Sequence, residues 1–304
     1  MAIVSVSQFM IRLGLKCLTE DKKAMINLEE HTVNRSGLFL TGYYYYFNEK
    51  RIQLLGNAEW HLLNTFDKTL QNQRLEELCK RKPPAIILTR ELKAFDKLVE
   101  YANKYKVPLF CSPLPSGTFM HKMTHYLYEL LAENVQRHGV LVDVYGVGIL
   151  IIGESGVGKS ETALELIKRG HRLIADDVVI IKRMESKLIG SAPELIQNFL
   201  EVRGLGILDI AHLYGYGSVR NNMIIDYIIK LETWKKNKEY DRLGLDEKFE
   251  EILDISVGYS VLPIKPGRNI AMLIEVAARN YRQKEAGYNS AEKLNEKLLE
   301  NLSK

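Results

Sequence analysis

One short stretch near the middle of the chain constrains its fold more than any other. It satisfies the pattern G-x-x-x-x-G-K-[ST] and reads Gly153-Glu154-Ser155-Gly156-Val157-Gly158-Lys159-Ser160. An apolar run at residues 147–152 precedes it, and Ala163, Leu164 and Ile167 follow at helical spacing. A strand before and a helix after are the context that this motif requires. The sequence therefore predicts a strand, a phosphate-binding loop and a helix, rather than a glycine-rich turn that binds no nucleotide.

The residue types in this stretch suit phosphate. Glycines allow consecutive backbone N–H groups to turn toward phosphate oxygens, and the N-terminus of the next helix adds a favourable dipole. Lys159 supplies a positive charge to the β- and γ-phosphates, and Ser160 is a candidate Mg²⁺ ligand. The loop does not by itself identify the phosphoryl acceptor, because kinases, motors, switches and sensors share it.

Composition disfavours several classes of protein. Of 304 residues, 42 are basic and 38 acidic, and the net charge of +4 is too small for a nucleic-acid footprint. Residues 1–130 carry +5 and the remainder −1. No run approaches the roughly 18 to 20 apolar residues of a membrane-spanning helix, and no secretory signal is apparent. Three widely spaced cysteines, Cys17, Cys79 and Cys111, fit reduced and buried thiols, so we expect a cytoplasmic protein.

The first 130 residues predict a small α/β domain. Helices are expected at residues 74–79 and 92–102, and strands at residues 85–89 and 107–111. This order is typical of a βαβ unit. Residues 41–47, with four consecutive tyrosines, predict a packed aromatic strand, and a contact surface is the alternative.

A domain boundary is expected near residue 130, so that residues 131–304 form the P-loop domain. Residues 138–145 alternate in hydropathy, turn at Gly146 and lead into the apolar run before the loop. Near-continuous hydrophobicity in that run predicts a strand in the middle of a sheet, covered on both faces. Residues 290–302 predict an amphipathic helix that docks on its own core or on a partner.

Two adjacent carboxylates follow the loop by about one helix. Asp176 and Asp177 lie at a strand break, where one side chain is a candidate for approaching Mg²⁺ and the other for facing a nucleophile. A crossover helix would return the chain beside the strand that it left. A plain acidic turn is the alternative. His138, on pattern alone, is structural or exposed.

Other charged groups lie near turn-forming residues. Glu201 and Arg203 are expected on the same side of an extended strand, before glycines that permit close backbone approach, and a surface ion pair is the alternative. Residues 240–244 and 263–268 each place a cation beside turn formers. Both suit phosphate binding, and ordinary solvated loops are the alternative.

The long run from His138 to Val178, which contains the loop and the aspartate pair, closely resembles bacterial HPr kinase/phosphorylase. The likeness continues through residues 200–209, 240–244 and 263–268 and covers most of residues 118–282, while the N-terminal domain matches more loosely. The aromatic and lysine-rich character is similar to the mycoplasma branch. The resemblance implies an α/β fold in which residues 1–130 form a regulatory or assembly domain. Residues 131–304 form a P-loop kinase domain resembling the nucleotide core of phosphoenolpyruvate carboxykinase.

The resemblance also implies an activity. Members of the family use ATP and Mg²⁺ to phosphorylate a seryl residue on HPr, the phosphocarrier protein of the sugar phosphotransferase system. They also remove this phosphate by phosphorolysis with inorganic phosphate, which yields pyrophosphate. The resemblance further implies that the enzyme regulates carbon metabolism and sugar uptake. It also implies a homohexamer whose C-terminal helices contact HPr. No nucleic acid or membrane partner is expected.

The resemblance assigns roles residue by residue. Those that bind phosphate and Mg²⁺ are Lys159, Ser160 and Glu201. Those in the catalytic centre are His138, Asp177, which transfers the proton, and Arg242. The signature and dephosphorylation segments contribute Arg203, Gly204, Lys265 and Arg268.

Two other functions are compatible with the residues. The first is a small-metabolite kinase or carboxykinase-like phosphoryl enzyme, which would ignore HPr. The second is a nucleotide-gated scaffold, in which ATP only orders the hexamer and neither phosphoserine nor pyrophosphate forms. A nucleic-acid motor is disfavoured, because the basic excess is small and lies away from the P-loop domain.

Overall fold

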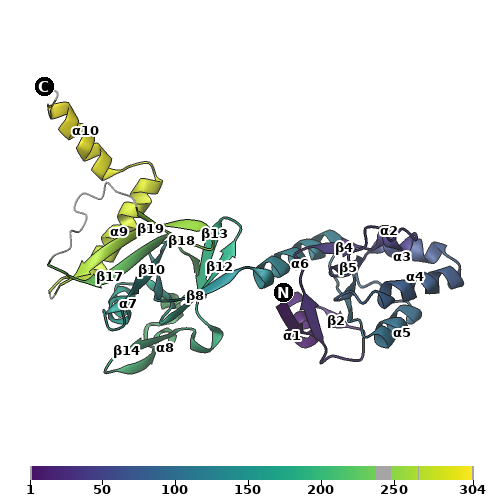
Figure 1. The fold of residues 1–304 in the computed structure, drawn as a ribbon. Coiled ribbons are helices and arrows are strands. Elements are labelled where there is room, and N and C mark those ends of the chain that lie inside the picture. Colours follow the sequence, from purple (N-terminus) through teal and green to yellow (C-terminus); the bar gives the residue numbers. More distant parts are fainter. Residues whose placement is uncertain (1, 237–247, 266, 303–304) are drawn as a thin grey trace. The chain divides into compact units, whose positions relative to one another are not determined.

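The computed structural model describes residues 2–236, 248–265 and 267–302. Its contacts divide the chain into two compact units, Met1–Ala132 and Glu133–Lys304. Each unit combines helices with strands (Figure 1), so the predicted mixed α/β class is confirmed. Within the described ranges, no helix has both the length and the apolar character needed to cross a membrane.

The first unit is built on a mostly parallel five-stranded sheet of order β2-β7-β6-β5-β4, in which only β2 is antiparallel to its neighbour. Its strands are β2 (Lys16–Cys17), β4 (Val33–Arg35), β5 (Ile52–Leu55), β6 (Ile86–Leu88) and β7 (Leu109–Cys111). A separate pair consists of β1 (Ala2–Ser5) and β3 (Met25–Leu28). The helices are α1 (Val6–Leu13), α2 (Gly37–Leu40), α3 (Asn57–Thr65), α4 (Lys68–Lys80), α5 (Asp96–Tyr105) and α6 (Ser116–Leu131).

Helices cover both faces of this sheet. Phe9 of α1 and Phe119 of α6 share one core with Leu54 of β5. The neighbouring residue, Leu55, belongs to a second core with α3, α4 and α5, where it is joined by Leu75. Successive side chains of a strand point to opposite faces, so one strand serves both cores.

The predicted βαβ pattern of the first unit is confirmed, although α5 begins at Asp96 and leaves Leu92 outside it. The strand predicted at residues 41–47 is wrong. This segment forms turns, and Tyr45 and Tyr46 are 85% and 77% exposed. Tyr44 instead packs against the guanidinium groups of Arg74 and Arg81. The segment pairs with no neighbouring strand, so aromatic propensity alone does not make it extended.

The second unit has three layers: helices, a six-stranded sheet of order β11-β9-β10-β17-β19-β18, and a four-stranded sheet of order β16-β13-β12-β8. The larger sheet contains β9 (Val140–Val144), β10 (Val147–Gly153), β11 (Arg172–Ala175), β17 (Tyr227–Thr233), β18 (Lys248–Ile252) and β19 (Ile255–Ile264). The smaller sheet contains β8 (Asn134–His138), β12 (Val178–Met184), β13 (Lys187–Ser191) and β16 (Asn222–Ile224).

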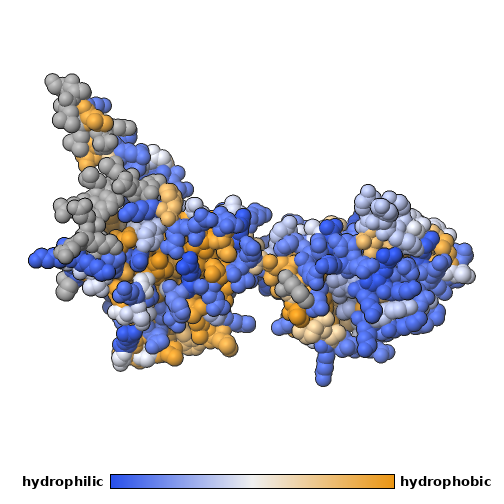
Figure 2. All heavy atoms as spheres, in the orientation of Figure 1, coloured by the Kyte–Doolittle hydropathy of each residue, from blue (hydrophilic) through white to orange (hydrophobic). Residues whose placement is uncertain are grey.

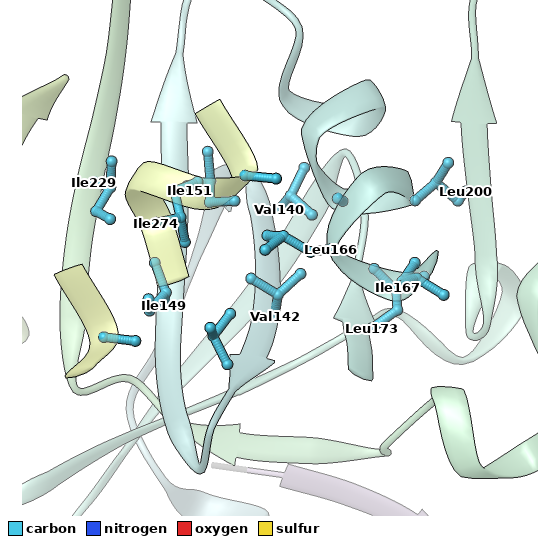
Figure 3. Packing of buried hydrophobic residues seen from close by; sticks show 14 of the residues in the cluster. Val140, Val142, Ile149, Ile151, Leu166, Ile167, Leu173, Leu200, Ile229 and Ile274 are labelled. Carbon is cyan, nitrogen blue, oxygen red and sulfur yellow. The ribbon is translucent and has the colours of Figure 1, made fainter. Parts of the chain in front are cut away.

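The described part of this unit also contains two short 3-10 turns, η1 (Glu194–Ile196) and η2 (Tyr216–Ser218), a hairpin and four helices. The hairpin is formed by β14 (Phe199–Val202) and β15 (Gly206–Asp209). The helices are α7 (Lys159–Lys168), α8 (Ile210–Tyr214), α9 (Ile270–Glu285) and α10 (Ser290–Leu302). Figure 3 shows the helical face of the large sheet, where Ile274 of α9 lies beside Ile149 of β10, and Leu166 of α7 lies beside Val140 and Val142 of β9.

The strand that leads into the glycine-rich loop is central, as predicted. β10 pairs with β9 on one side and with β17 on the other, and alternate residues enter the two cores, with Ile149 on the helical face and Leu150 on the other. β10, β17 and β19 are parallel, so their ends at Gly153, Thr233 and Ile264 lie at one edge of the sheet.

Two expectations for this unit need correction or qualification. The strand predicted at residues 138–145 is two strands, because Gly139 lies so close to β10 that a Cβ there would be 2.7 Å from the Ile151 carbonyl oxygen. His138 therefore ends β8, in the smaller sheet. The predicted C-terminal helix forms as α10, but Leu294 and Leu299 are 52% and 60% exposed, so these two side chains are not buried in their own core.

Candidate phosphate-binding and phosphoryl-transfer site

The glycine-rich loop connects the end of β10 to the start of α7. Gly153 has φ +151° and passes so close to β17 that a Cβ would lie 2.5 Å from the Leu231 carbonyl oxygen. Gly158, the residue before α7, has φ +95°, which favours glycine. No side chain among the described residues caps α7, so the first amides of this helix are open to a ligand. Such open amides, with the helix dipole behind them, form an anion site.

Lys159 lies against this loop. Its ammonium donates hydrogen bonds to the carbonyl oxygens of Gly153 and Glu154, each at 3.0 Å. The positive charge is thus held at the mouth of the loop, where phosphate oxygens would replace the carbonyl partners.

Asp176 is tied directly to the loop. Its buried carboxylate accepts hydrogen bonds from the Ser160 hydroxyl at 3.0 and 3.2 Å and from the Glu201 backbone N–H at 2.9 Å. Burial raises the pKa of Asp176, and these hydrogen bonds act against that rise. The hydroxyl and carboxylate oxygens are hard ligands of the kind that Mg²⁺ prefers.

The described residues contain no group of three or more His, Cys, Asp or Glu side chains arranged to hold a metal ion. Ser160 and Asp176 fit Mg²⁺ nevertheless, because this ion commonly takes one or two protein ligands and completes its shell with substrate phosphates and water. A phosphate on the open amides of α7 would lie beside them.

Asp177 points away from Asp176. Its φ of +63° turns the backbone, and its side chain is 70% exposed, with Oδ1 3.6 Å from Nδ1 of His138. The backbone N–H of Gly139 donates to the Asp177 carbonyl at 3.0 Å, so the end of β8 and the start of β12 hold the two side chains together. One carboxylate of the pair is therefore buried against the loop, and the other faces solvent.

The route by which this pair reaches the loop differs from the expected one. β11 does not return beside β10; it pairs with β9, one strand further along the sheet. Because α7 passes over β9 on its way, Ser160 at the start of the helix still meets Asp176.

The β14–β15 hairpin holds the loop from the other side. Arg203 lies in the turn rather than in the expected strand, which ends at Val202. Its guanidinium donates to the Ser155 hydroxyl at 3.0 Å and lies over Gly156, where a Cβ would be 2.9 Å away. The side chain of Glu201 is exposed, and Gly204 occupies the same turn with φ +86°. The hairpin thus contacts both Ser155 and, through the Glu201 amide, the Asp176–Ser160 pair.

The outer side of this hairpin is apolar. Leu205 and Ile207 are 69% and 73% exposed, and the neighbouring Leu213 and Tyr216 are also exposed. Apolar residues gather around β14 and α8 in Figure 2.

The loop with Lys265 and Arg268 follows β19, at the same edge of the sheet as the glycine-rich loop. Lys265 Nζ lies 3.7 Å from the ring centroid of Trp234, which follows β17. Arg268 donates to the Pro263 carbonyl at 2.9 Å. The structure thus brings this loop to the edge of the sheet where the glycine-rich loop lies. Arg242 and the rest of residues 240–244 lie outside the described residues.

Two family profiles match the chain almost end to end. The profile described as "HPr Serine kinase N terminus" matches residues 4–127, and the one described as "HPr Serine kinase C-terminal domain" matches residues 129–298. The chain belongs to the HPr kinase/phosphorylase family. The family predicted from the sequence is therefore confirmed.

Relatives of this HPr kinase/phosphorylase family chain match over nearly its full length. The HPr kinase/phosphorylase of Peptoclostridium acidaminophilum is 45% identical over 99% of this chain and 98% of its own. That of Bacillus subtilis is 42% identical over 99% and 97%, and that of Clostridium tetani is 50% identical over 89% and 88%. The predicted mycoplasma branch is not supported by these relatives.

A solved structure of the Hpr(Ser) kinase/phosphatase from Coxiella burnetii is 37% identical and covers 53% of this chain and 98% of its own, with a TM-score of 0.48.

Sequence reasoning left one residue out of the site. It identified the Asp176–Asp177 pair but selected only Asp177, whereas Asp176 is the one that contacts Ser160. The available signal was the pair itself, one helix after the loop; which member turns inward depends on the backbone at Asp177. Two cavities of about 680 and 650 Å³ lie elsewhere, and no residue of the loop lines them.

Proposed function

We propose that this chain transfers the γ-phosphoryl group of ATP to a seryl residue of HPr, and that it removes this group by phosphorolysis with inorganic phosphate, giving pyrophosphate. Such an enzyme would regulate carbon metabolism and sugar uptake. The observation that carries the proposal is the open phosphate loop. The hydrogen-bonded Ser160–Asp176 pair lies at the start of the helix that follows this loop, and the exposed Asp177 is the next residue after Asp176. The name that the relatives share, HPr kinase/phosphorylase, supplies the acceptor.

In the forward direction, Asp177 accepts the proton of the HPr serine as the serine oxygen attacks the γ-phosphorus. The bond from this phosphorus to the β-phosphate oxygen breaks, and ADP leaves. The exposure of the Asp177 carboxylate suits this role, because a protein substrate must reach it from solvent. Lys159 and the open amides of α7 bind the phosphates. Ser160 and Asp176, with Glu201 as a further ligand, would hold Mg²⁺, which would offset negative charge on the transferring group.

In the reverse direction, an oxygen of inorganic phosphate attacks the phosphorus of phosphoserine. The bond from phosphorus to the serine oxygen breaks, the new bond completes pyrophosphate, and Asp177 returns its proton to the serine oxygen. The same loop holds inorganic phosphate in one direction and the ATP phosphates in the other, so one site serves both reactions. Arg242 and the loop with Lys265 and Arg268 are proposed to support the transfer and the dephosphorylation, respectively.

His138 is proposed to orient or charge-stabilise Asp177, because its Nδ1 lies 3.6 Å from the carboxylate. His138→Ala should lower both rates by more than about threefold, which corresponds to more than about 0.6 kcal/mol of barrier. Initial rates in the two directions measure this effect. If both stay within that factor of the parent, the role is wrong.

The assembly and docking roles are part of the proposal. The first unit is assigned a regulatory or assembly role in a homohexamer, and the second a nucleotide core like that of phosphoenolpyruvate carboxykinase. The exposed Leu294 and Leu299 support α10 as an element that contacts HPr. Deletion of residues 291–304 should weaken HPr recognition and leave nucleotide binding intact. Equal loss of both would contradict this assignment.

The decisive experiment incubates the chain with HPr, Mg²⁺ and ATP, and then with inorganic phosphate in place of ATP. Intact-mass measurement should show one added phosphoryl group on HPr, and the second incubation should remove it and release pyrophosphate. Asp177→Asn should abolish both changes. ATP binding without phosphoserine or pyrophosphate would favour the scaffold, and phosphorylation of a metabolite with HPr unchanged would favour the small-metabolite kinase.

A further inference from the structure

Glu275 of α9 accepts three hydrogen bonds from two other parts of the second unit. Its Oε2 lies 2.9 Å from Nη1 of Arg169, and its Oε1 lies 3.0 Å from Nε2 of His171. The hydroxyl of Tyr145 also donates to Oε1, at 3.2 Å. Arg169 and His171 follow the last turn of α7, and Tyr145 lies in the turn between β9 and β10. One carboxylate therefore joins a helix end and a strand turn to α9.

The environment of this carboxylate is built to keep it charged. Its side chain is only 15% exposed, and His171 is 5% exposed. Burial alone would raise the pKa of Glu275, but the hydrogen bonds from His171, Arg169 and Tyr145 hold it below its usual value. Tyr145 is in turn fixed to α9, because Arg279 lies 4.5 Å from its ring centroid and Arg282 donates to its carbonyl oxygen at 3.1 Å.

Each of the three joined elements leads to the phosphate edge of the sheet. α7 begins with Lys159 and Ser160, ten residues before Arg169, and β10 runs from the Tyr145 turn to Gly153. α9 begins directly after the loop of Lys265 and Arg268, with Asn269 as its cap. The Glu275 cluster lies toward the other ends of α7 and β10, so it sets how α9 lies relative to the elements that carry the glycine-rich loop.

We propose that Glu275 is a positioning residue, which holds the Lys265–Arg268 loop at the correct distance from the glycine-rich loop. The inference rests on the proposed function. Phosphorolysis depends on both loops, because inorganic phosphate must be held by one while the phosphoserine is attacked beside the other. Phosphorylation depends mainly on the glycine-rich loop, because the phosphoryl group to be transferred is part of the ATP that this loop binds. Loss of Glu275 therefore shifts the balance between the two reactions.

The test compares Glu275→Gln with Glu165→Gln. Glu165 also pairs with Arg169, at 3.1 Å, but it lies on α7 itself and is 41% exposed, so its loss leaves α7 and α9 joined. Glu275→Gln should lower kcat/KM for phosphorolysis about tenfold, mainly through a higher KM for phosphate, and should change the kinase reaction by less than about twofold. Glu165→Gln should leave both reactions unchanged. Equal losses in the two directions for Glu275→Gln would overturn the inference.

A second measurement separates positioning from a general loss of structure. If Glu275 acts through the Lys265–Arg268 loop, adding Glu275→Gln to Arg268→Ala should cost phosphorolysis little beyond Arg268→Ala alone. Full additivity would count against the inference. If Glu275→Gln does not fold, Tyr145→Phe removes one donor and should shift the same ratio by about twofold; no shift would count against the inference. A parent chain inactive in both directions would overturn the proposed function and this inference together, whereas an active parent with an unchanged ratio would overturn only the inference.

Discussion

Both units place a helix directly after a buried parallel strand, but among the described residues only the helix of the first unit binds the amide at its start with a carboxylate of its own. In the first unit, α3 follows β5, and its own Glu59 accepts a hydrogen bond from the Gly56 N–H at 2.9 Å. Glu59 is buried and is also bound by Arg35. In the second unit, α7 follows β10, and no side chain caps it. The start of α3 is thus closed by its own carboxylate, which binds the amide just before the helix, and the start of α7 is open.

The difference teaches what an anion site requires. A strand end followed by a helix N-terminus occurs in many α/β proteins, and the dipole and amides are present in each case. Such an end becomes available to phosphate only where the sequence leaves those amides without a partner. Gly158 and Gly56 both lack a capping side chain, but Glu59 in the first turn of α3 reaches back to the Gly56 N–H and places a carboxylate at that helix start, whereas no carboxylate binds the amide of Gly158 in the described residues.

The largest expected effect is at the open end. Lys159→Ala should lower both reaction rates about 100- to 1000-fold, because it removes a charge aimed at the transferring phosphoryl group. Its only described hydrogen bonds go to carbonyl oxygens of the loop, so thermal stability should be unchanged. Rates and melting temperatures check both parts, with Lys168→Ala, at the far end of the same helix, as the control. Retention of rates within tenfold would contradict the role of the open end.

The closed end should matter for stability instead. Glu59→Ala should destabilise the first unit by about 2 to 3 kcal/mol, because it leaves the Gly56 amide and Arg35 without their acceptor. Nucleotide affinity should not change. Trp60 of α3 reports this unfolding when Trp234, in the second unit, is replaced by Phe in both parent and variant. If nucleotide affinity fell while the free energy of unfolding stayed unchanged, the start of α3 would serve binding rather than stability, which would contradict the comparison.

Asp176→Asn should show that the buried Asp176 carboxylate beside the open end serves Mg²⁺-dependent nucleotide binding at the expense of unfolding stability. Burial raises the pKa of Asp176, so the folded state disfavours its charge and gains stability relative to the unfolded chain as the pH falls through that raised value. At neutral pH the amide should therefore leave unfolding stability unchanged or higher. Mg²⁺-dependent nucleotide affinity should fall about 10- to 100-fold. Calorimetric titrations with and without Mg²⁺ measure this, and loss of Mg²⁺-free binding of equal size would contradict it.

The smallest effect is expected at another strand end of the first unit. The hydroxyls of Thr89, after β6, and Ser116, at the start of α6, are 2.7 Å apart. Ser116→Ala should cost about 1 kcal/mol of unfolding free energy, the value of one hydrogen bond, and leave both reactions unchanged. Urea unfolding followed by Trp60 fluorescence is the measurement. Any change in nucleotide affinity would show that this strand end is not isolated from the site.

What could be predicted from the sequence was local. The glycine-rich loop, the central strand before it and α7 follow from residues that are neighbours in the chain, and so do the strands β6 and β7. The contact between Arg203 and Ser155 joins residues 48 positions apart, and a strand pattern placed Arg203 wrongly because the turn depends on glycines with positive φ.

Errors also arose where a short pattern was compatible with two backbones. The alternation at residues 138–145 continues through Gly139, yet the chain changes sheets there because β10 passes so close. The tyrosines at residues 43–46 favour strands by propensity, but no strand in the described part of the chain pairs with them. The local sequence shows neither the contact of Gly139 with β10 nor whether a strand lies beside residues 43–46.

The position of β10 at the centre of its sheet has a consequence for the energetics of binding. Its amides are hydrogen-bonded to strands on both sides and covered on both faces, so we expect them to exchange with solvent only when the whole unit unfolds. The phosphate loop is therefore anchored to a segment of slow hydrogen exchange. A polyphosphate bound there lowers the free energy of the entire folded unit, so its affinity should appear as slower exchange far from the ligand.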